Sequence, residues 1–578
     1  MSPTARWVIR IGVVALLAWI VVSGAVLWTA RNHTNDGLDS LGRARHELDD
    51  GGLLRGDATE ELRSARGSFA SAHDLANGIV LAPWRVIPLL GANVESGEAL
   101  TAAAERVAEV AEQSASASKV LLAQHPTTGP ERLEMVRRLG AITRRADRAL
   151  ERVPLGPDFF VVAPLGDARS RFIARYDQLR DALRSATSGA DGVERMLRGP
   201  RKYLVLAANN AEMRGGSGML LSAGTATFHD GEFSIGEMRP SSDFNLPAGA
   251  VDVPKDLSRL WGFAPIGRDW RWLGTSPRFD VTAPLAADMW EAATGERVDG
   301  VLAVDPVVVQ SLLDAQGPIE VDGRRLTGDD VIQYLLLEQY GSIEPGDPEQ
   351  VARRDELGTV ARTAVDALST RAWNPNRLVR RLSDAGKGRH ALAWARDPVE
   401  QRAWEAAGIA GQLRFDSLAV SILNTGGNKL DPFIAVAARL EVRDRSDGGR
   451  DAEVVLRFEN RAPDGLPTYV SGPHPATDLS KGEYQGLVAL NTPGVASLPK
   501  LEGLPSLLVV GRDGPTKVVA AGPLRLQPGE HAEVTVRLVL PEGLDQLVVE
   551  PSARIPAISW RYRATHWQDT AEHTVDLT

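Results

Sequence analysis

The chain has 578 residues, of which 43% are hydrophobic and 24% charged, a composition typical of packed globular protein rather than of disordered chain. At roughly 100–200 residues per domain, this length predicts about three to five folding units. The formal net charge is −10 and there is no cysteine. The charge argues against nucleic acid as a partner, and the missing cysteines exclude disulfide frameworks, thiolate catalysis and cysteine-bound metals.

An uncharged apolar run from residue 11 to residue 30 opens the chain. As a helix it is long enough to cross the roughly 30 Å hydrocarbon layer of a bilayer. Arg10 precedes it, and Trp28 and Arg31 mark its other end, as interfacial anchors do. We expect a cytoplasmic tail over residues 1–10 and a transmembrane helix over residues 11–30.

A cleaved signal peptide with its cleavage site near residues 23–25 is the alternative. The apolar run is longer than the roughly 7–15 residues of a signal peptide's core and continues past that site, which favours the anchor. Both interpretations export the rest of the chain. We therefore expect a single-pass protein of the cell membrane with its bulk extracytoplasmic.

Residues 37–198 are rich in Ala, Arg, Glu and Leu, with apolar residues at helical spacing such as Leu100, Ala103 and Val107. Proline and glycine interrupt the pattern near residues 83, 88–91, 125–130 and 154–157, where helices end or turn. A sustained coiled-coil heptad is not compatible with these breaks. The segment is expected to form an α-helical stalk or bundle.

Residues 199–412 alternate between strand and helix patterns. A hairpin is predicted around Asp230-Gly231, and later a strand over 298–305, a helix over 306–315, a strand over 319–322 and a helix over 327–340. This alternation predicts an α/β domain. From residue 413 to residue 578 short strands separated by turns predict a β-sandwich of about eight strands.

Three motifs in this middle part carry a family resemblance. They are RKYLVL with NNAEMRGGSG over residues 201–218, VDGVLAVDP over 298–306, and NTGGNKLD over 424–431. In this order, the three motifs resemble those of the domain of unknown function 4012 (DUF4012) family. The resemblance implies a location in the cell envelope more than a particular chemistry.

A second set of motifs is similar to the LytR-CpsA-Psr transferases: the stretch from residue 285 to LLDAQGPIEV at 312–321, LTGDDVIQYL at 326–335, and Gly346-Asp347 before Arg353-Arg354. These envelope enzymes hold a polyprenyl-pyrophosphate sugar in an arginine-lined pocket with a divalent cation and transfer the glycopolymer to peptidoglycan. The resemblance implies a LytR-CpsA-Psr-like α/β domain.

Carried over residue by residue, this resemblance places pyrophosphate-binding candidates at Arg214, Arg239, Arg353 and Arg354, and a metal candidate, for Mg²⁺, at Asp243. Arginine forks suit pyrophosphate because they make bidentate, permanently charged contacts. The sequence departs from the family after Arg214, where residues 215–217 replace a metal-binding aspartate.

Two interpretations of local motifs stay open. The glycine-rich residues 215–218 either expose backbone N–H groups to an anion or form a tight turn that needs positive φ. Residues 428–431, NKLD, form either a turn between domains or a ligand contact. The ten histidines form no zinc motif, and no nucleophile elbow or phosphate-binding loop is present in the sequence.

Two function classes follow. The favoured one is a non-catalytic scaffold or binding module of the cell envelope, related to envelope polysaccharide assembly. The alternative is a LytR-CpsA-Psr-like phosphotransferase or receptor for polyprenyl-pyrophosphate-linked glycans, so enzymatic activity is left open. The expected partners are the bilayer and either a lipid-linked glycan or other envelope proteins.

Overall fold

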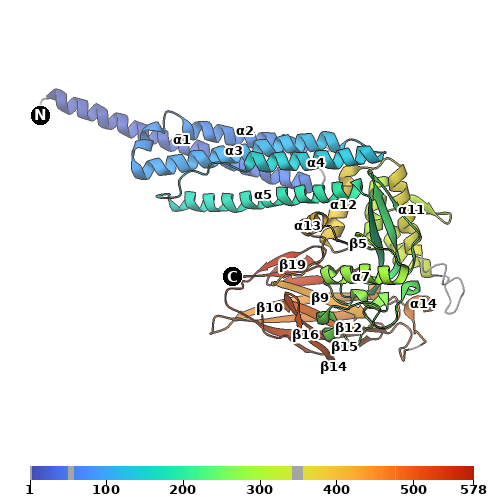
Figure 1. Ribbon diagram of the computed structural model, residues 1–578. Coiled ribbons are helices and arrows are strands. Elements are labelled where there is room, and N and C mark those ends of the chain that lie inside the picture. Colours follow the sequence, from blue (N-terminus) through green and yellow to red (C-terminus); the bar gives the residue numbers. More distant parts are fainter. Residues whose placement is uncertain (1–2, 50–56, 342–355, 476) are drawn as a thin grey trace. The chain divides into compact units, whose positions relative to one another are not determined.

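The computed structural model describes residues 3–49, 57–341, 356–475 and 477–578, and shows a multidomain protein of mixed helix and sheet (Figure 1). The chain divides into two compact units. The helical unit comprises Met1–His125 and Glu134–Ala190, and the mixed unit comprises Pro126–Leu133 and Asp191–Thr578.

Five long helices build the helical unit: α1 (Pro3–Asp49), α2 (Asp57–Asn77), α3 (Pro88–Leu122), α4 (Gly129–Leu150) and α5 (Ala163–Arg198), with the short 3₁₀ helix η1 (Ala82–Val86) before α3. Small side chains let them pack closely: Phe69 of α2 lies among Ala65, Ala104 and Ala108. A Cβ at Gly37 of α1 would lie 2.7 Å from the Phe69 ring, so glycine is what lets this ring approach the helix.

No helix combines the length and apolar character needed to span a bilayer in the part of the chain that the structure describes. The expected membrane helix over residues 11–30 falls partly outside that part, because the side chains of residues 1–16 are not described. The anchor therefore stays a prediction.

The mixed unit contains a central sheet in the order β3-β2-β1-β5-β8, with β4 beside β2. Its strands are β1 (Arg201–Met213), β2 (Gly218–His229), β3 (Glu232–Ile235), β4 (Arg239–Pro240), β5 (Gly300–Val304) and β8 (Ala391–Ala395). Only β1 and β5 pair in parallel among these described strands; the other pairs are antiparallel. The end of β1 is central and buried.

Helices and short elements surround this sheet: α6 (Lys255–Leu260), α7 (Phe279–Thr294), α8 (Pro306–Gln316), α9 (Val331–Leu336), α11 (Glu356–Thr370), α12 (Pro375–Lys387) and α13 (Pro398–Ala406), the 3₁₀ helices η2 (Ser241–Phe244), η3 (Trp270–Thr275) and η4 (Glu338–Tyr340), and the hairpin β6 (Ile319–Val321) and β7 (Arg324–Leu326). The expected helix over 327–340 starts later, at Val331. The Asp330 carboxylate accepts a hydrogen bond from the Thr327 backbone N–H at 2.7 Å, which forms a local turn before the helix.

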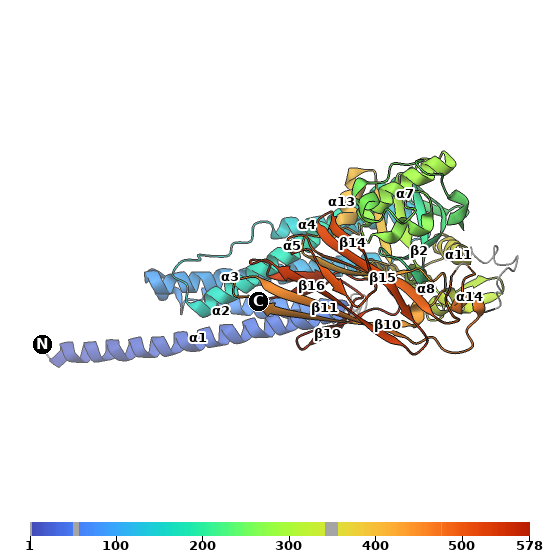
Figure 2. The same cartoon turned by 90° about the horizontal axis from the view of Figure 1, so that it is seen from below.

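Two six-stranded sheets follow in the described part of the chain, in the orders β13-β16-β11-β10-β18-β19 and β14-β15-β12-β9-β17-β20 (Figure 2). Their strands are β9 (Ser417–Asn424), β10 (Ile434–Asp444), β11 (Arg450–Asn460), β12 (Tyr484–Pro493), β13 (Lys500–Glu502), β14 (Ser506–Asp513), β15 (Thr516–Leu526), β16 (His531–Leu540), β17 (Gln546–Val549), β18 (Ser559–Tyr562), β19 (Thr565–Gln568) and β20 (His573–Asp576). This is more than the eight strands expected, because the short strands at the sheet ends carry little sequence pattern.

The middle strands β9, β12 and β15 of the second sheet are buried on both faces. On one face Val420, Val488 and Val519 join the core between the two sheets. On the other face Leu423 and Val518 join the core that contains the central sheet and α7. The expected boundary near residue 413 therefore falls inside one compact unit, since the two ranges share a hydrophobic core.

Candidate functional site

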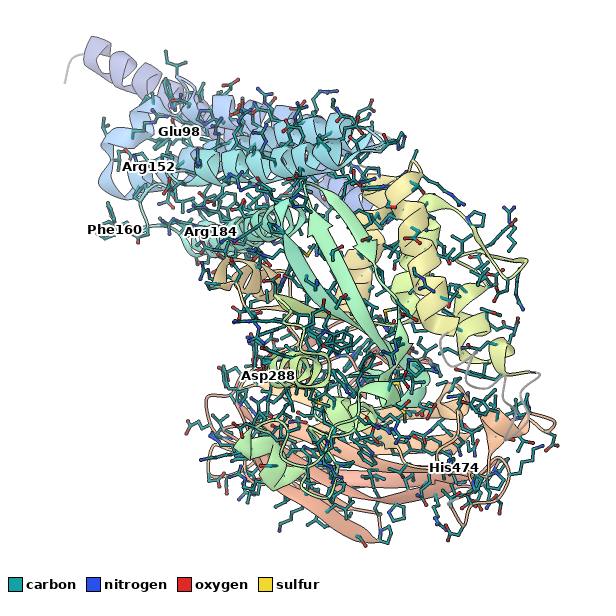
Figure 3. The ribbon with its side chains drawn as sticks, turned by 45° about the vertical axis from the view of Figure 1, so that its right-hand side comes forward. Glu98, Arg152, Phe160, Arg184, Asp288 and His474 are labelled. Carbon is teal, nitrogen blue, oxygen red and sulfur yellow. The ribbon has the colours of Figure 1, made fainter. Side chains whose placement is uncertain are left out.

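A cavity of about 550 Å³ opens in the mixed unit where the end of β1 meets the loop after β9 and the segment around α14 (Thr468–Ser471). Its volume lies within the range of small-molecule sites. Figure 3 labels His474, one of the lining residues, on the loop that follows α14. The lining combines aromatic, amide and charged side chains, among them Asn209, Glu212, Arg214, Arg271, Trp272, Gln339, Tyr340, Asn424, Lys429, Tyr469 and His474.

A buried lysine lies in the cavity wall. Lys429 forms an ion pair with Glu212, and its ammonium nitrogen lies 4.9 Å from the ring centroid of Tyr340 and 5.2 Å from that of Tyr469. Burial by itself would lower the pKa of Lys429, but the Glu212 carboxylate and the two tyrosines together outweigh burial and raise that pKa above its ordinary value. The lysine is therefore a permanent cation held by a carboxylate and two aromatic rings.

The Tyr340 ring is held in turn. Its hydroxyl accepts a hydrogen bond of 2.8 Å from the amide nitrogen of Asn209, and its ring lies 5.5 Å from that of Tyr469. Burial raises the pKa of Tyr340, so the phenol stays neutral. The two tyrosines and the lysine therefore form one group of mutually contacting side chains.

A second buried pair fixes the loop that carries Lys429. Asp431 and Arg554 are both fully buried and lie 2.8 Å apart. The Asp431 carboxylate also accepts hydrogen bonds from the Met213 backbone N–H, the Asn424 amide and the Tyr484 hydroxyl. One carboxylate thus joins the end of β1, the loop after β9 and the C-terminal segment. The sequence motifs at 209–218 and 424–431 meet here.

Arg214, the first pyrophosphate candidate, lines the cavity and is buried. Its guanidinium donates to the carbonyl oxygens of Arg271 (2.7 Å), Met213 (3.0 Å) and Asn424 (2.7 Å). Its other contact is the Trp272 ring, whose centroid lies 5.0 Å from the guanidinium carbon. Arg214 therefore holds three backbone segments together at the cavity wall.

The glycine-rich turn after Arg214 does not have the geometry expected of a positive-φ turn. Gly215 and Gly216 are not among the residues with positive φ in the described chain. A Cβ at Gly215 would lie 2.2 Å from the Thr275 carbonyl oxygen, and the Gly216 N–H donates to the Gly274 carbonyl at 3.0 Å. The prediction of a turn needing positive φ is wrong here, because these glycines serve a close approach of the turn to η3.

Arg239 and Asp243 lie together but outside the lining residues. They form an ion pair of 2.9 Å, and the Arg239 guanidinium lies 5.0 Å from the Phe244 ring centroid. Ser241 and Ser242, between them in sequence, do line the cavity. The pair thus flanks the wall, with the Asp243 carboxylate engaged by Arg239.

Arg353 and Arg354 lie outside the described residues, so the convergence of four arginines on one pyrophosphate site stays a prediction. Within the described ranges, no group of three or more histidine, aspartate or glutamate side chains is placed to hold a metal ion. The Mg²⁺ site at Asp243 likewise stays a prediction.

Sequence reasoning left NKLD at 428–431 open between a turn and a ligand contact, and it did not single out Glu212, Trp272, Tyr340 or Tyr469. In the structure Asp431 of this motif is a buried cross-link and Lys429 lines the cavity, so a ligand contact by the motif stays a prediction. The sequence offered one signal for this part of the site, the joint occurrence of NKLD with NNAEMR at 209–214. Each motif supplies one partner of the Lys429–Glu212 pair.

Residues 198–340 match the family model described as "Protein of unknown function (DUF4012)". This confirms the DUF4012 resemblance, and the matched segment contributes Glu212, Arg214, Trp272 and Tyr340 to the cavity. No match is found among the curated proteins or among the solved structures.

Proposed function

We propose that the protein is a membrane-anchored, extracytoplasmic binding module of the cell envelope, and that its cavity binds a polar, ring-containing ligand such as a segment of envelope glycan. The anchor is the apolar run over residues 11–30. The observation that carries the ligand class is the pairing of aromatic rings with a charge-balanced polar wall in one cavity.

A sugar ring has one face of C–H groups and a rim of hydroxyls. Trp272 and Tyr469 offer partly exposed aromatic rings on which such a face packs by dispersion. Asn209 and Gln339 add amide groups, which both donate and accept hydrogen bonds and so match hydroxyl rims.

The cations of the lining argue for a neutral ligand. Lys429 is paired with Glu212, Arg271 is paired with Asp269 at 2.6 Å, and Arg214 is engaged by three carbonyls. A neutral glycan leaves these pairs intact, whereas a pyrophosphate competes with the protein's own acceptors for each cation. Binding without transfer therefore requires the least rearrangement of the site.

The second candidate is a LytR-CpsA-Psr-like phosphotransferase or receptor acting on a polyprenyl-pyrophosphate glycan, with Mg²⁺ as its ion. One observation favours it: Arg214 and Arg271 both line the same cavity. Guanidinium groups are the preferred protein partners of pyrophosphate oxygens.

The test is a calorimetric titration of the full chain in detergent micelles with neutral envelope oligosaccharides and, separately, with a short-chain polyprenyl pyrophosphate. Trp272→Ala is expected to weaken glycan binding at least tenfold, since a buried aromatic contact contributes roughly 1.4 kcal/mol or more. Trp394→Ala is the matched control, because Trp394 also packs on the same core under an arginine, Arg396, at 5.5 Å, but lies outside the lining.

Three outcomes separate the candidates. Glycan binding that Trp272→Ala weakens and Trp394→Ala does not supports the proposal. Pyrophosphate binding with no response to the neutral glycan supports the transferase or receptor. Equal effects of the two tryptophan variants on either ligand would show that the cavity is not the binding site.

A further inference from the structure

Two loops of the helical unit present large apolar side chains to solvent. The connection from α2 to α3 exposes Ile79 (85%) and Val86 (83%), and the connection from α4 to α5 exposes Phe159 (63%) and Phe160 (66%). Figure 3 shows Phe160 at the same end of the helical unit as Glu98 and Arg152, with Arg184 further along α5. We call these two connections the apolar tips.

The second tip is held in place on α3. The Asn93 amide donates to the Phe160 carbonyl oxygen at 2.9 Å, and its oxygen accepts from the Val162 N–H at 2.8 Å. Gly156, earlier in the same loop, lies so close to Ser96 of α3 that a Cβ would approach its Cα to 3.1 Å. The exposed rings are therefore presented by a fixed backbone.

The backbone of this loop is strained at Phe160, whose side chain is exposed. Phe160 has a φ of +59°, in the left-handed region that aromatic residues rarely adopt. Its ring lies 5.9 Å from that of Phe159, edge to face, so the two rings form one exposed cluster. A strained residue that exposes apolar surface, instead of burying it, points to a function at that surface.

The first tip is tied to α1. The Trp84 indole N–H donates to the Ser23 hydroxyl at 2.8 Å. Ser23 lies within the apolar run over residues 11–30, which also exposes the side chains of Val22 and Trp28. The first tip thus adjoins the outward-facing apolar surface of the segment proposed as the anchor.

The length of α1 sets a depth for this contact. Ser23 precedes Trp28 by five residues, which is about 7.5 Å along a helix at 1.5 Å per residue. Tryptophan at the end of a membrane helix marks the interface, and interfacial segments embed roughly 5–10 Å into the headgroup and acyl boundary. A loop that contacts Ser23 lies at that depth when Trp28 lies at the membrane surface.

We infer that the two apolar tips insert into the outer leaflet of the bilayer beside α1. The helical unit then contacts the membrane at three places, α1 and the two tips, and not through one helix alone. This inference rests on the anchor proposed above. We assign the lipid as the group that covers the tips, because the first tip adjoins the apolar surface of the anchor segment. Together the two tips carry the mixture of aromatic and aliphatic side chains typical of interfacial segments.

The test measures depth with single spin labels on the full chain reconstituted in phosphatidylglycerol–phosphatidylethanolamine vesicles. The chain has no cysteine, so Val86→Cys and Phe160→Cys each give one labelling site. Val120→Cys is the matched control: Val120 is also an exposed valine, at 69%, but lies at the far end of α3, about 48 Å from its start at 1.5 Å per residue.

In the expected result, labels at positions 86 and 160 collide more often with oxygen than with a water-soluble nickel chelate, and the label at 120 shows the reverse. Circular dichroism melts that match the parent chain show that the variants are folded. Labels at 86 and 160 that behave like the label at 120, on chains that float with the vesicles, overturn the inference and leave the anchor intact.

Two further outcomes are distinct. Chains that fail to float with vesicles contradict the anchor itself, and with it the inference. Labels at 86 and 160 that are equally shielded from the nickel chelate in detergent-free buffer without vesicles show a protein contact between copies, which also overturns the lipid assignment.

Discussion

The buried pair of Lys429 and Glu212 provides the sharpest test of the cavity's construction. Lys429→Met keeps the length of the side chain but leaves the Glu212 carboxylate inside the protein without its cation. Removing one partner of a buried ion pair costs roughly 3–5 kcal/mol of unfolding free energy. This is a large part of the roughly 5–15 kcal/mol that a folded protein has in total.

The double variant Lys429→Met/Glu212→Gln removes both charges. Replacement of a whole buried pair by neutral groups of similar shape is often close to neutral, so the double variant is expected to regain most of the loss. The matched control is Lys202→Met. Lys202 also pairs with a glutamate, Glu296, but the two side chains are 38% and 35% exposed, and such pairs contribute only about 0–1 kcal/mol.

The assay is urea unfolding followed by tryptophan fluorescence, which reports mainly on the mixed unit because most of the chain's tryptophans lie in it. A Lys429→Met variant as stable as the parent chain would refute the reasoning. So would a double variant no more stable than the single one, since the loss would then come from packing and not from an uncompensated charge.

Three other predictions concern stability. Gly37→Ala is expected to destabilise the helical unit by about 1–3 kcal/mol, because the added Cβ would clash with the Phe69 ring. Gly42→Ala on the same helix meets no atom within 4 Å and is expected to stabilise the unit by roughly 0.5–1 kcal/mol. Equal thermal midpoints of the two variants by circular dichroism would contradict this difference. Gly215→Ala is expected to destabilise the mixed unit by at least about 1 kcal/mol, because its Cβ would overlap a backbone carbonyl, and a wild-type urea midpoint would argue against that contact. Burial raises the pKa of Asp569 to about 6, so the folded state binds this proton more tightly than the unfolded state does. The unfolding free energy is therefore expected to fall by on the order of 3 kcal/mol as pH rises from about 4 to 6. Asp569→Asn should flatten this dependence of the unfolding free energy on pH, and an unchanged slope would contradict the assignment.

Local signals in the sequence were sufficient for many individual elements. The Asp230-Gly231 pair predicted a hairpin, and both residues have the positive φ that its turn requires. A strand over 298–305 and a helix over 306–315 were predicted, and the structure has β5 at Gly300–Val304 and α8 at Pro306–Gln316. Asp305 is the cap of that helix, since its carboxylate accepts from the Val307 N–H at 2.9 Å. These features depend on neighbours within a few residues.

The site depended on contacts that no local pattern encodes. Glu212 and Lys429 are 217 residues apart in sequence, and Asp431 and Arg554 are 123 apart. Arg214 was singled out by resemblance, but its role in joining three carbonyls follows from backbone segments that approach only in the fold. The membrane helix, the LytR-CpsA-Psr-like domain and the glycan partner stay predictions.

The sheet whose middle strands are buried on both faces constrains the order in which this protein can fold. Its strands come from residues 417–576, yet one of its faces completes the core under the central sheet, whose first strand begins at Arg201. During synthesis β1, which ends at Met213, must wait with its apolar side chains uncovered until more than two hundred further residues have emerged and β9 begins at Ser417. The core of the mixed unit can therefore close only after the strands that follow residue 417 have been made.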